Sequence, residues 1–259
     1  WHAHLFKYAK KKKIKIFSSP FDEDALILLE KLNCPIYKIA SFEMTDLNLI
    51  KQVAKTKKPM IISTGMASID EIAEAYNTAK KNGCRDITLL YCVSNYPSKV
   101  EDFNLNNIKI LKKKFNCKIG FSDHSNDPRI ASAAVAAGAV VFEKHLILNK
   151  NDRSFDRKFS VNGKEFLEYK KNIDFNFNLL GKDKFIRSKS ENKSKIFRRS
   201  IYVIKNIKKG EKFTKKNIKT LRPALGIEAK FFEKLLYKKS SKNFRYGEVI
   251  KKNILKKLR

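Results

Sequence analysis

Two of the four histidines stand at the ends of predicted strands that follow one another along the chain. The two-residue period of a strand places Ser122 and His124 on one face, and Glu143 and His145 on one face of the next strand. The histidines lie 21 residues apart, about one strand-helix repeat, so they can sit at equal heights on neighbouring parallel strands. Two imidazoles with carboxylates nearby suit an open divalent-metal site. A hydrogen-bonded structural role is the alternative for each histidine alone.

Cationic and hydroxyl side chains follow the other predicted strands. Lys38 and Ser41 come after one strand, Ser63 after the next and Ser94 after a third. Such donors suit a phosphate or a carboxylate, although serines at strand ends also build turns. Ser19 precedes a predicted helix, where a hydroxyl caps the helix or faces the pocket.

Short β-branched or aromatic runs alternate with helical patterns and predict the elements that position these residues. The predicted strands are residues 14–18, 36–40, 60–63, 87–92, 118–122 and 140–145. Alternation with helices predicts a parallel sheet of right-handed crossovers. The repeat of about 25 residues favours a (β/α)8 barrel over a doubly wound sheet, because no glycine-rich dinucleotide loop is present. Six strands instead of eight suggest an N-terminally truncated barrel that lacks its first two strand-helix units.

The pattern changes along the last third of the chain. A partial barrel is predicted over residues 1–175 and a polar linker, rich in lysine and serine, over residues 176–198. Residues 199–259, with strand-like pieces near Leu221 and Val249, predict a compact and mainly β domain.

The formal net charge of +31 raises the possibility of a nucleic-acid partner. The excess lysine is spread through every segment without interleaved aromatic residues, so a solvated surface explains it more simply. The longest apolar run, residues 130–142, is too short for a bilayer and predicts a buried helix leading into a strand. We therefore expect neither a nucleic-acid nor a membrane partner. The four cysteines have no paired or metal-type spacing, and a cytoplasmic location is expected.

The motifs together resemble the sialic acid synthase family over nearly the whole chain. They are Ser18-Ser-Pro-Phe-Asp22, Tyr37-Lys-Ile-Ala-Ser-Phe-Glu43, Ile62-Ser-Thr-Gly-Met66, Tyr96-Pro97, Ser122-Asp-His124, Glu143-Lys-His145 and a tail beginning Arg198-Arg-Ser200. The resemblance implies a barrel with a C-terminal antifreeze-like (SAF) domain, in a domain-swapped homodimer where that domain covers the partner's active site.

The resemblance also implies a transferase reaction in which phosphoenolpyruvate condenses with an acetamido-sugar. It implies that His124 and His145 hold Mn²⁺ or Mg²⁺ and that Arg222 reaches the acyl group of the sugar. The other contacts that the resemblance implies are Ser19, Lys38, Ser41 and Ser122 for phosphoenolpyruvate, and Glu43, Glu143, Tyr96 and Asp156 on the sugar side. Ser63 and Ser94 are expected to bind substrate at the same mouth because of their places after the strands. We expect Glu43 and Glu143 to be catalytic together with the histidines.

Ala40 and Phe42 resemble the pseudaminic acid branch of the family, which uses a 2,4-diacetamido-2,4,6-trideoxy-altrose. The neuraminate and legionaminic acid branches are the alternatives. Ser154-Phe155-Asp156 and Arg222-Pro223-Ala224 depart from the family's usual Gly-Pro-Asp and Arg-Pro-Gly. Two other hypotheses are a metal-dependent barrel aldolase or shorter-chain sugar-acid synthase, and an inactive barrel that binds nucleic acid.

Overall fold

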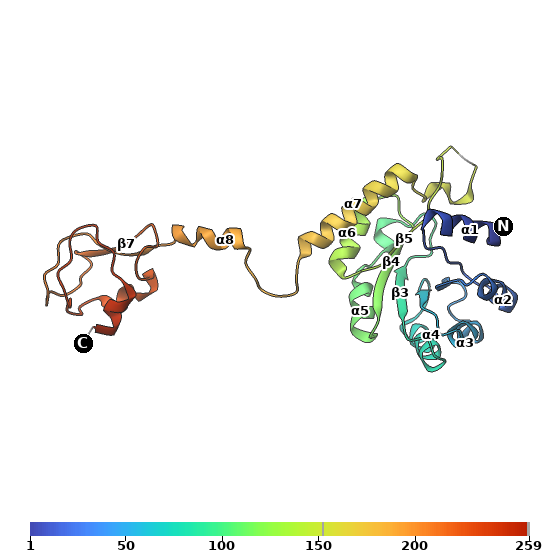
Figure 1. The fold of residues 1–259 in the computed structure, drawn as a ribbon, viewed down its shortest axis with the longest axis horizontal. Helices are drawn as coiled ribbons and strands as arrows, with labels where there is room; N and C mark the ends of the chain where they lie inside the picture. Colours follow the sequence, from blue (N-terminus) through green and yellow to red (C-terminus); the bar gives the residue numbers. More distant parts are fainter. Residues whose placement is uncertain (152, 258–259) are drawn as a thin grey trace. The chain divides into compact units, whose positions relative to one another are not determined.

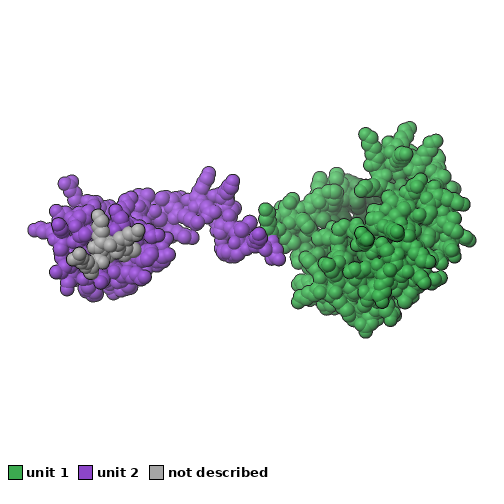
Figure 2. All heavy atoms as spheres, turned by 60° about the horizontal axis from the view of Figure 1, so that its bottom comes forward, with its two compact units in different colours: residues 1–182 green, residues 183–259 purple. Residues whose placement is uncertain are grey.

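The computed structural model describes residues 1–151 and 153–257. The chain divides into two compact units, Trp1–Lys182 and Asp183–Arg259, coloured green and purple in Figure 2. Each unit has its own cluster of buried apolar side chains, so each is described by itself.

Unit 1 is built on a curved parallel sheet whose strands lie side by side in chain order (Figure 1). The strands are β1 Tyr37–Ile39, β2 Met60–Ser63, β3 Ile87–Cys92, β4 Lys118–Asp123 and β5 Phe142–Lys144. Each neighbouring pair is parallel. Because every crossover leads to the adjacent strand, the sheet is part of a (β/α)8 barrel, as predicted.

Helices cover the outer face of this sheet (Figure 1). They are α1 His2–Lys12, α2 Glu23–Lys31, α3 Leu47–Lys55, α4 Ile69–Lys81, α5 Asn106–Lys114, α6 Pro128–Ala137 and α7 Gly163–Leu180. Side-chain caps define several of their starts, since Asp22, Asp46, Ser68, Asp127 and Asn162 accept hydrogen bonds from the first-turn amides.

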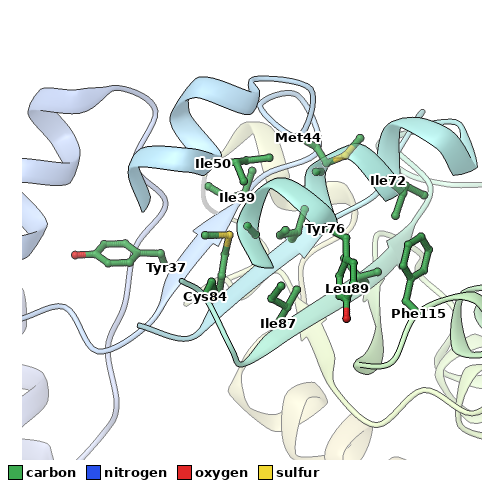
Figure 3. Close-up of a cluster of buried hydrophobic side chains, with 14 of the residues drawn as sticks. Tyr37, Ile39, Met44, Ile50, Ile72, Tyr76, Cys84, Ile87, Leu89 and Phe115 are labelled. Carbon is green, nitrogen blue, oxygen red and sulfur yellow. The ribbon is translucent and has the colours of Figure 1, made fainter. Parts of the chain in front are cut away.

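Strand alternation separates the core of unit 1 from its polar interior. Tyr37, Ile39 and Leu89 point toward the helices and pack with Ile50 and Ile72 (Figure 3). The residues between them along the strands point to the opposite face of the sheet. The helix-facing side therefore holds the core, and the inner side is free for polar residues.

The predicted strand over residues 14–18 is wrong for most of its length. The segment pairs with β1 only through one parallel bridge between Ser18 and Tyr37. Lys38 donates its amide to the Ser18 carbonyl at 3.3 Å, but Pro20 has no N–H with which to continue the ladder.

Unit 2 is small and mainly β, as predicted for the tail. Strands β6 Ser200–Val203 and β7 Ile218–Leu221 are antiparallel, and bridges such as Tyr202 to Val249 extend the pairing. The short helices of this unit are α8 Lys189–Lys193 and α9 Phe232–Leu235. Helix α7 of unit 1 reaches Leu180, so the first residues of the predicted linker are helical. In the described part of the chain, no helix combines the length and the apolar character needed to span a bilayer.

Candidate active site

The polar side chains meet at the carboxyl ends of β1 to β5, on the inner face of the sheet. Ser122 stands in register beside Cys92 of β3 on one side and beside Glu143 of β5 on the other. His124 and His145 follow directly after β4 and β5. The two-residue period thus brings these groups to one edge, as the sequence predicts.

A cavity of about 390 Å³ lies at this edge. Its lining includes nine of the predicted site residues: Ser19, Lys38, Ser41, Ser63, Tyr96, Ser122, His124, Glu143 and His145. The wall also contains Phe17, Ala40, Phe42 and Cys92. A cavity of this size suits a small metabolite held by a few convergent polar groups.

An ion pair crosses the cavity floor between the first and last strands. The ammonium of Lys38 lies 2.8 and 3.0 Å from the two carboxylate oxygens of Glu143, and Ser122 Oγ donates to Glu143 Oε1 at 2.7 Å. Burial alone would raise the pKa of Glu143, but the Lys38 charge and the two hydrogen bonds outweigh it and lower that pKa. Glu143 is therefore an ionised carboxylate at neutral pH.

The two imidazoles are arranged so that one nitrogen of each remains available. His124 Nδ1 donates to the Val93 carbonyl at 2.9 Å, and His145 Nδ1 lies 3.1 Å from Asp156 Oδ2. Burial lowers the pKa of His124 against the opposing effect of the Val93 hydrogen bond, so its ring is neutral. With Nδ1 committed, Nε2 presents its lone pair, which is the arrangement of metal-binding histidines.

The donor set fits an open divalent-metal site. The ring centroids of His124 and His145 are 5.3 Å apart, with the Glu143 carboxylate close to His124. Among the described residues, no three His, Cys, Asp or Glu side chains gather as a closed metal site. Two protein ligands would leave coordination positions for water and substrate, as catalytic sites require.

Aromatic rings pack against both imidazoles, of which His124 is buried and His145 is partly exposed. The Tyr96 ring centroid is 4.3 Å from that of His124, and the Phe159 centroid is 4.9 Å from that of His145. Burial also raises the pKa of Tyr96, so its phenol keeps its proton and can donate a hydrogen bond.

Comparison with known proteins assigns the family. The NeuB family model matches residues 1–184, and the SAF domain model matches residues 198–256. The chain belongs to the NeuB family.

Two NeuB relatives and one solved structure show the extent of the likeness. The chain is 46% identical over 243 residues to the pseudaminic acid synthase of Helicobacter pylori, covering 93% of this chain and 72% of that protein. It is 41% identical over 253 residues to the N,N'-diacetyllegionaminic acid synthase of Campylobacter jejuni, covering 96% and 76%. The crystal structure of a putative spore coat polysaccharide biosynthesis protein E from Chromobacterium violaceum aligns with a TM-score of 0.83 at 25% identity. It covers all of this chain and 77% of that one.

Four predicted NeuB site residues lie outside the cavity lining. Glu43 is half-buried in the turn after β1, and its Oε2 has no hydrogen-bond partner among the described residues. Ser94 Oγ is buried close to Gly65, where an added Cβ would lie 2.0 Å from it. Asp156 contacts His145 instead of the cavity. Arg222 is an exposed residue of unit 2, so its contact with the sugar stays a prediction.

Sequence reasoning missed three residues at this NeuB site. Cys92 Sγ lies 3.1 Å from Ser41 Oγ, and strand alternation from Leu90 would have placed it on the inner face. Phe159 follows no strand, so no sequence signal marked it. Lys144, inside the Glu143-Lys-His145 motif, is also among the residues that line the cavity, and its ammonium pairs with Asp123.

Proposed function

We propose that this protein is a pseudaminic acid synthase. It condenses phosphoenolpyruvate with 2,4-diacetamido-2,4,6-trideoxy-altrose and releases phosphate and a nine-carbon acidic sugar. The observation that carries the proposal is the convergence of Lys38, several hydroxyls and two imidazoles on one cavity. This set combines an anion site with an electrophilic site.

The anion half of the cavity suits phosphoenolpyruvate. Lys38 is 8% exposed and supplies a positive charge, while Ser63 Oγ is buried without a hydrogen-bond partner among the described residues. Ser19, Ser41 and Ser122 add hydroxyls on the same wall. Charge-assisted hydrogen bonds from such groups hold a phosphate and a carboxylate strongly.

The reaction requires little covalent chemistry from the protein. The C3 carbon of phosphoenolpyruvate bonds to the aldehyde carbon, and the aldehyde oxygen takes a proton to become a hydroxyl. Positive charge then develops at C2, where water adds and loses a proton. Phosphate leaves with the electron pair of the C2–O bond. The ionised Glu143 carboxylate stabilises the positive charge at C2, and Lys38 stabilises the departing phosphate.

His124 and His145 would hold a divalent ion, Mn²⁺ or Mg²⁺, which supplies electrophilic activation of the sugar aldehyde or of water. Asp156 orients the His145 ring through Nδ1, and Val93 does the same for His124. Tyr96 packs against the His124 ring and Phe159 against the His145 ring.

Ala40 and Phe42 support the choice of sugar, because both line the cavity. The 46% identity to the pseudaminic acid synthase of Helicobacter pylori supports the same choice. The 41% identity to a legionaminic acid synthase makes a legionaminic acid precursor the second candidate, with the neuraminate precursor N-acetylmannosamine third. We expect a cytoplasmic homodimer in which the SAF unit of one subunit brings Arg222 to the sugar of the other.

Phosphate release tests this proposal. The protein expressed from its complete reading frame is supplied with phosphoenolpyruvate, Mn²⁺ and either the diacetamido-altrose or N-acetylmannosamine. We expect release only with the altrose sugar and a loss of at least about 100-fold in the His124→Ala variant. A His2→Ala variant, altered at an exposed residue of α1, is the matched control and retains activity.

Release only with N-acetylmannosamine or with a legionaminic acid precursor would keep the reaction and overturn the choice of sugar. No release with any of these sugars would overturn the synthase proposal and leave the nucleic-acid-binding hypothesis, which predicts salt-sensitive binding.

A further inference from the structure

A buried pair of opposite charges lies behind the two histidines, on the helix-facing side of the sheet. Asp123 and Lys144 are register partners in the last pair of the β4–β5 ladder. Their side chains are 1% and 3% exposed, and Lys144 Nζ lies 3.4 Å from Asp123 Oδ2. Both residues also line a second cavity, together with polar residues such as Lys150 and Glu165. Burying a charged pair costs desolvation free energy, so its presence here needs an explanation.

The ammonium of Lys144 is bound to backbone as well as to the carboxylate. Nζ donates to the Asp123 carbonyl at 3.2 Å and to the Ser125 carbonyl. The other oxygen of the Asp123 carboxylate accepts from the Ser125 amide at 2.8 Å and from Ser125 Oγ at 2.6 Å. The Tyr169 ring of α7 lies over Nζ, 5.8 Å from it to the centroid. The ammonium thus donates hydrogen bonds to two backbone carbonyls and forms an ion pair with Asp123 Oδ2, which accepts no hydrogen bond among the described residues.

These contacts surround the two histidines in sequence and in space. The carbonyls held by Lys144 belong to the residues directly before and after His124, and Lys144 itself lies between Glu143 and His145. Within the described residues the ladder ends at this pair, so sheet hydrogen bonds no longer hold the histidines to each other. Their carbonyls instead accept from Ser98 and Val161, which belong to separate loops.

We propose that Lys144, together with Asp123, is a positioning residue that sets the separation of the His124 and His145 imidazoles. Elsewhere in unit 1 the sheet packs against its helices through a cluster of buried apolar side chains. The ammonium adds directional bonds across the gap between the two chain segments, which apolar packing does not provide. The inference rests on the metal role proposed above for the two rings.

The test removes both charges together, so that no unpaired charge is left buried. The double variant Lys144→Met with Asp123→Asn keeps similar volumes and the acceptor for Ser125. One control is Leu111→Ala, a truncation of a core residue in α5 that lowers stability. A second control is Lys118→Met with Asp86→Asn, which removes an exposed ion pair at the other end of β4.

Two measurements report on the geometry of the two imidazoles and do not depend on enzymatic activity. The first is the nuclear Overhauser contact between the two imidazoles in the metal-free protein, whose centroids lie 5.3 Å apart. It should be lost in the Lys144→Met, Asp123→Asn double variant and kept in both controls. The dissociation constant for Mn²⁺, measured by electron paramagnetic resonance, should rise at least about tenfold. The KM for phosphoenolpyruvate should stay within about twofold, because Lys38 is untouched.

The inference would be overturned if the Lys144→Met, Asp123→Asn double variant retained the imidazole contact and bound Mn²⁺ within about twofold of the Leu111→Ala control. If the wild-type protein binds no Mn²⁺, the proposed metal role fails while the imidazole contact still decides the positioning role. Lys144→Arg is measured in parallel, because it keeps the buried positive charge and changes only the geometry of its contacts. It keeps the inference testable if the double variant does not fold.

Discussion

At the scale of single residues, His124 shows how burial prepares a side chain for its role. The ring is 4% exposed, and this desolvation lowers its pKa from the usual 6.5. A neutral ring with Nδ1 donating to Val93 leaves Nε2 as a lone-pair donor over the whole physiological range. The same burial makes protonation of this residue costly to the fold.

The consequence is a pH-dependent contribution of His124 to stability. Because the folded-state pKa is below the unfolded one, the unfolded state binds more protons between the two values, and stability falls as pH falls through that window. The unfolding free energy of the metal-free wild type minus that of His124→Gln should therefore decrease below about pH 6.5 and level off under the folded pKa. Urea denaturation of both proteins between pH 4.5 and 8 measures it, on the order of 1 kcal/mol per unit of pKa shift. A constant difference would show that the ring is not desolvated.

Strand alternation explains why so much of the site was predictable at this scale. The faces of Ser122, His124, Glu143 and His145 follow from the two-residue period alone. The Lys38–Glu143 ion pair could not be predicted in the same way, because it joins residues 105 positions apart and depends on sheet curvature. The inner and outer faces of a strand are local properties, whereas a contact across the barrel mouth depends on tertiary structure.

At the scale of elements, β4 is the strand on which the site depends most. It pairs on both sides, and Gly120 in its middle lets β5 and β3 approach closely. A Cβ at Gly120 would lie 2.4 Å from the Val141 carbonyl oxygen and 2.4 Å from Leu90 Cδ2. The backbone oxygen cannot move aside without distorting the neighbouring strand.

Gly120→Ala should therefore destabilise unit 1 by about 2 to 3 kcal/mol, as overpacking does in a close-packed core. Gly163→Ala is the matched control, because nothing lies within 4 Å of a Cβ at that first position of α7. We expect the control to change stability by less than about 1 kcal/mol, and toward greater stability. Chemical denaturation followed by circular dichroism compares the two. Equal stabilities would mean that β4 and β5 can separate without loss.

Element positions were predictable where local signals agreed, with one exception over residues 14–18. Capping residues such as Ser68 and Asn162 mark helix starts that the sequence already shows. The apolar run over residues 14–18 has a strand composition, but only Ser18 pairs with β1. The missing N–H of Pro20 stops the ladder beyond Ser18, and nothing in the structure explains why residues 14–17 do not pair.

At the scale of the whole molecule, two separate cores share one chain. Ile201, Phe213 and Ile250 are fully buried in unit 2, and Tyr37 and Ile39 are fully buried in unit 1. The change of pattern along the sequence predicted a second, mainly β domain from residue 199, whereas the two compact units divide between Lys182 and Asp183. Their mutual arrangement has no counterpart in local sequence patterns. The net charge of +31 belongs to this scale too, since its summed field would draw the anionic substrate proposed above toward the protein.

Residues 181–188 join the units and are exposed and without regular secondary structure, which predicts where a protease cuts first. The chain carries 57 lysines and arginines, yet those within folded elements are protected, while Lys182, Lys184 and Arg187 lie in the exposed segment. Brief trypsin treatment should therefore give two resistant fragments that end or begin within this segment, identified by intact mass. A variant with glutamine at these three positions should be cut at least about tenfold more slowly, whereas the same change at Lys112, Lys113 and Lys114 of α5 should leave the rate unchanged. First cuts inside β1 to β5 would mean that unit 1 opens more readily than its joining segment, and that the two cores do not fold as the structure divides them.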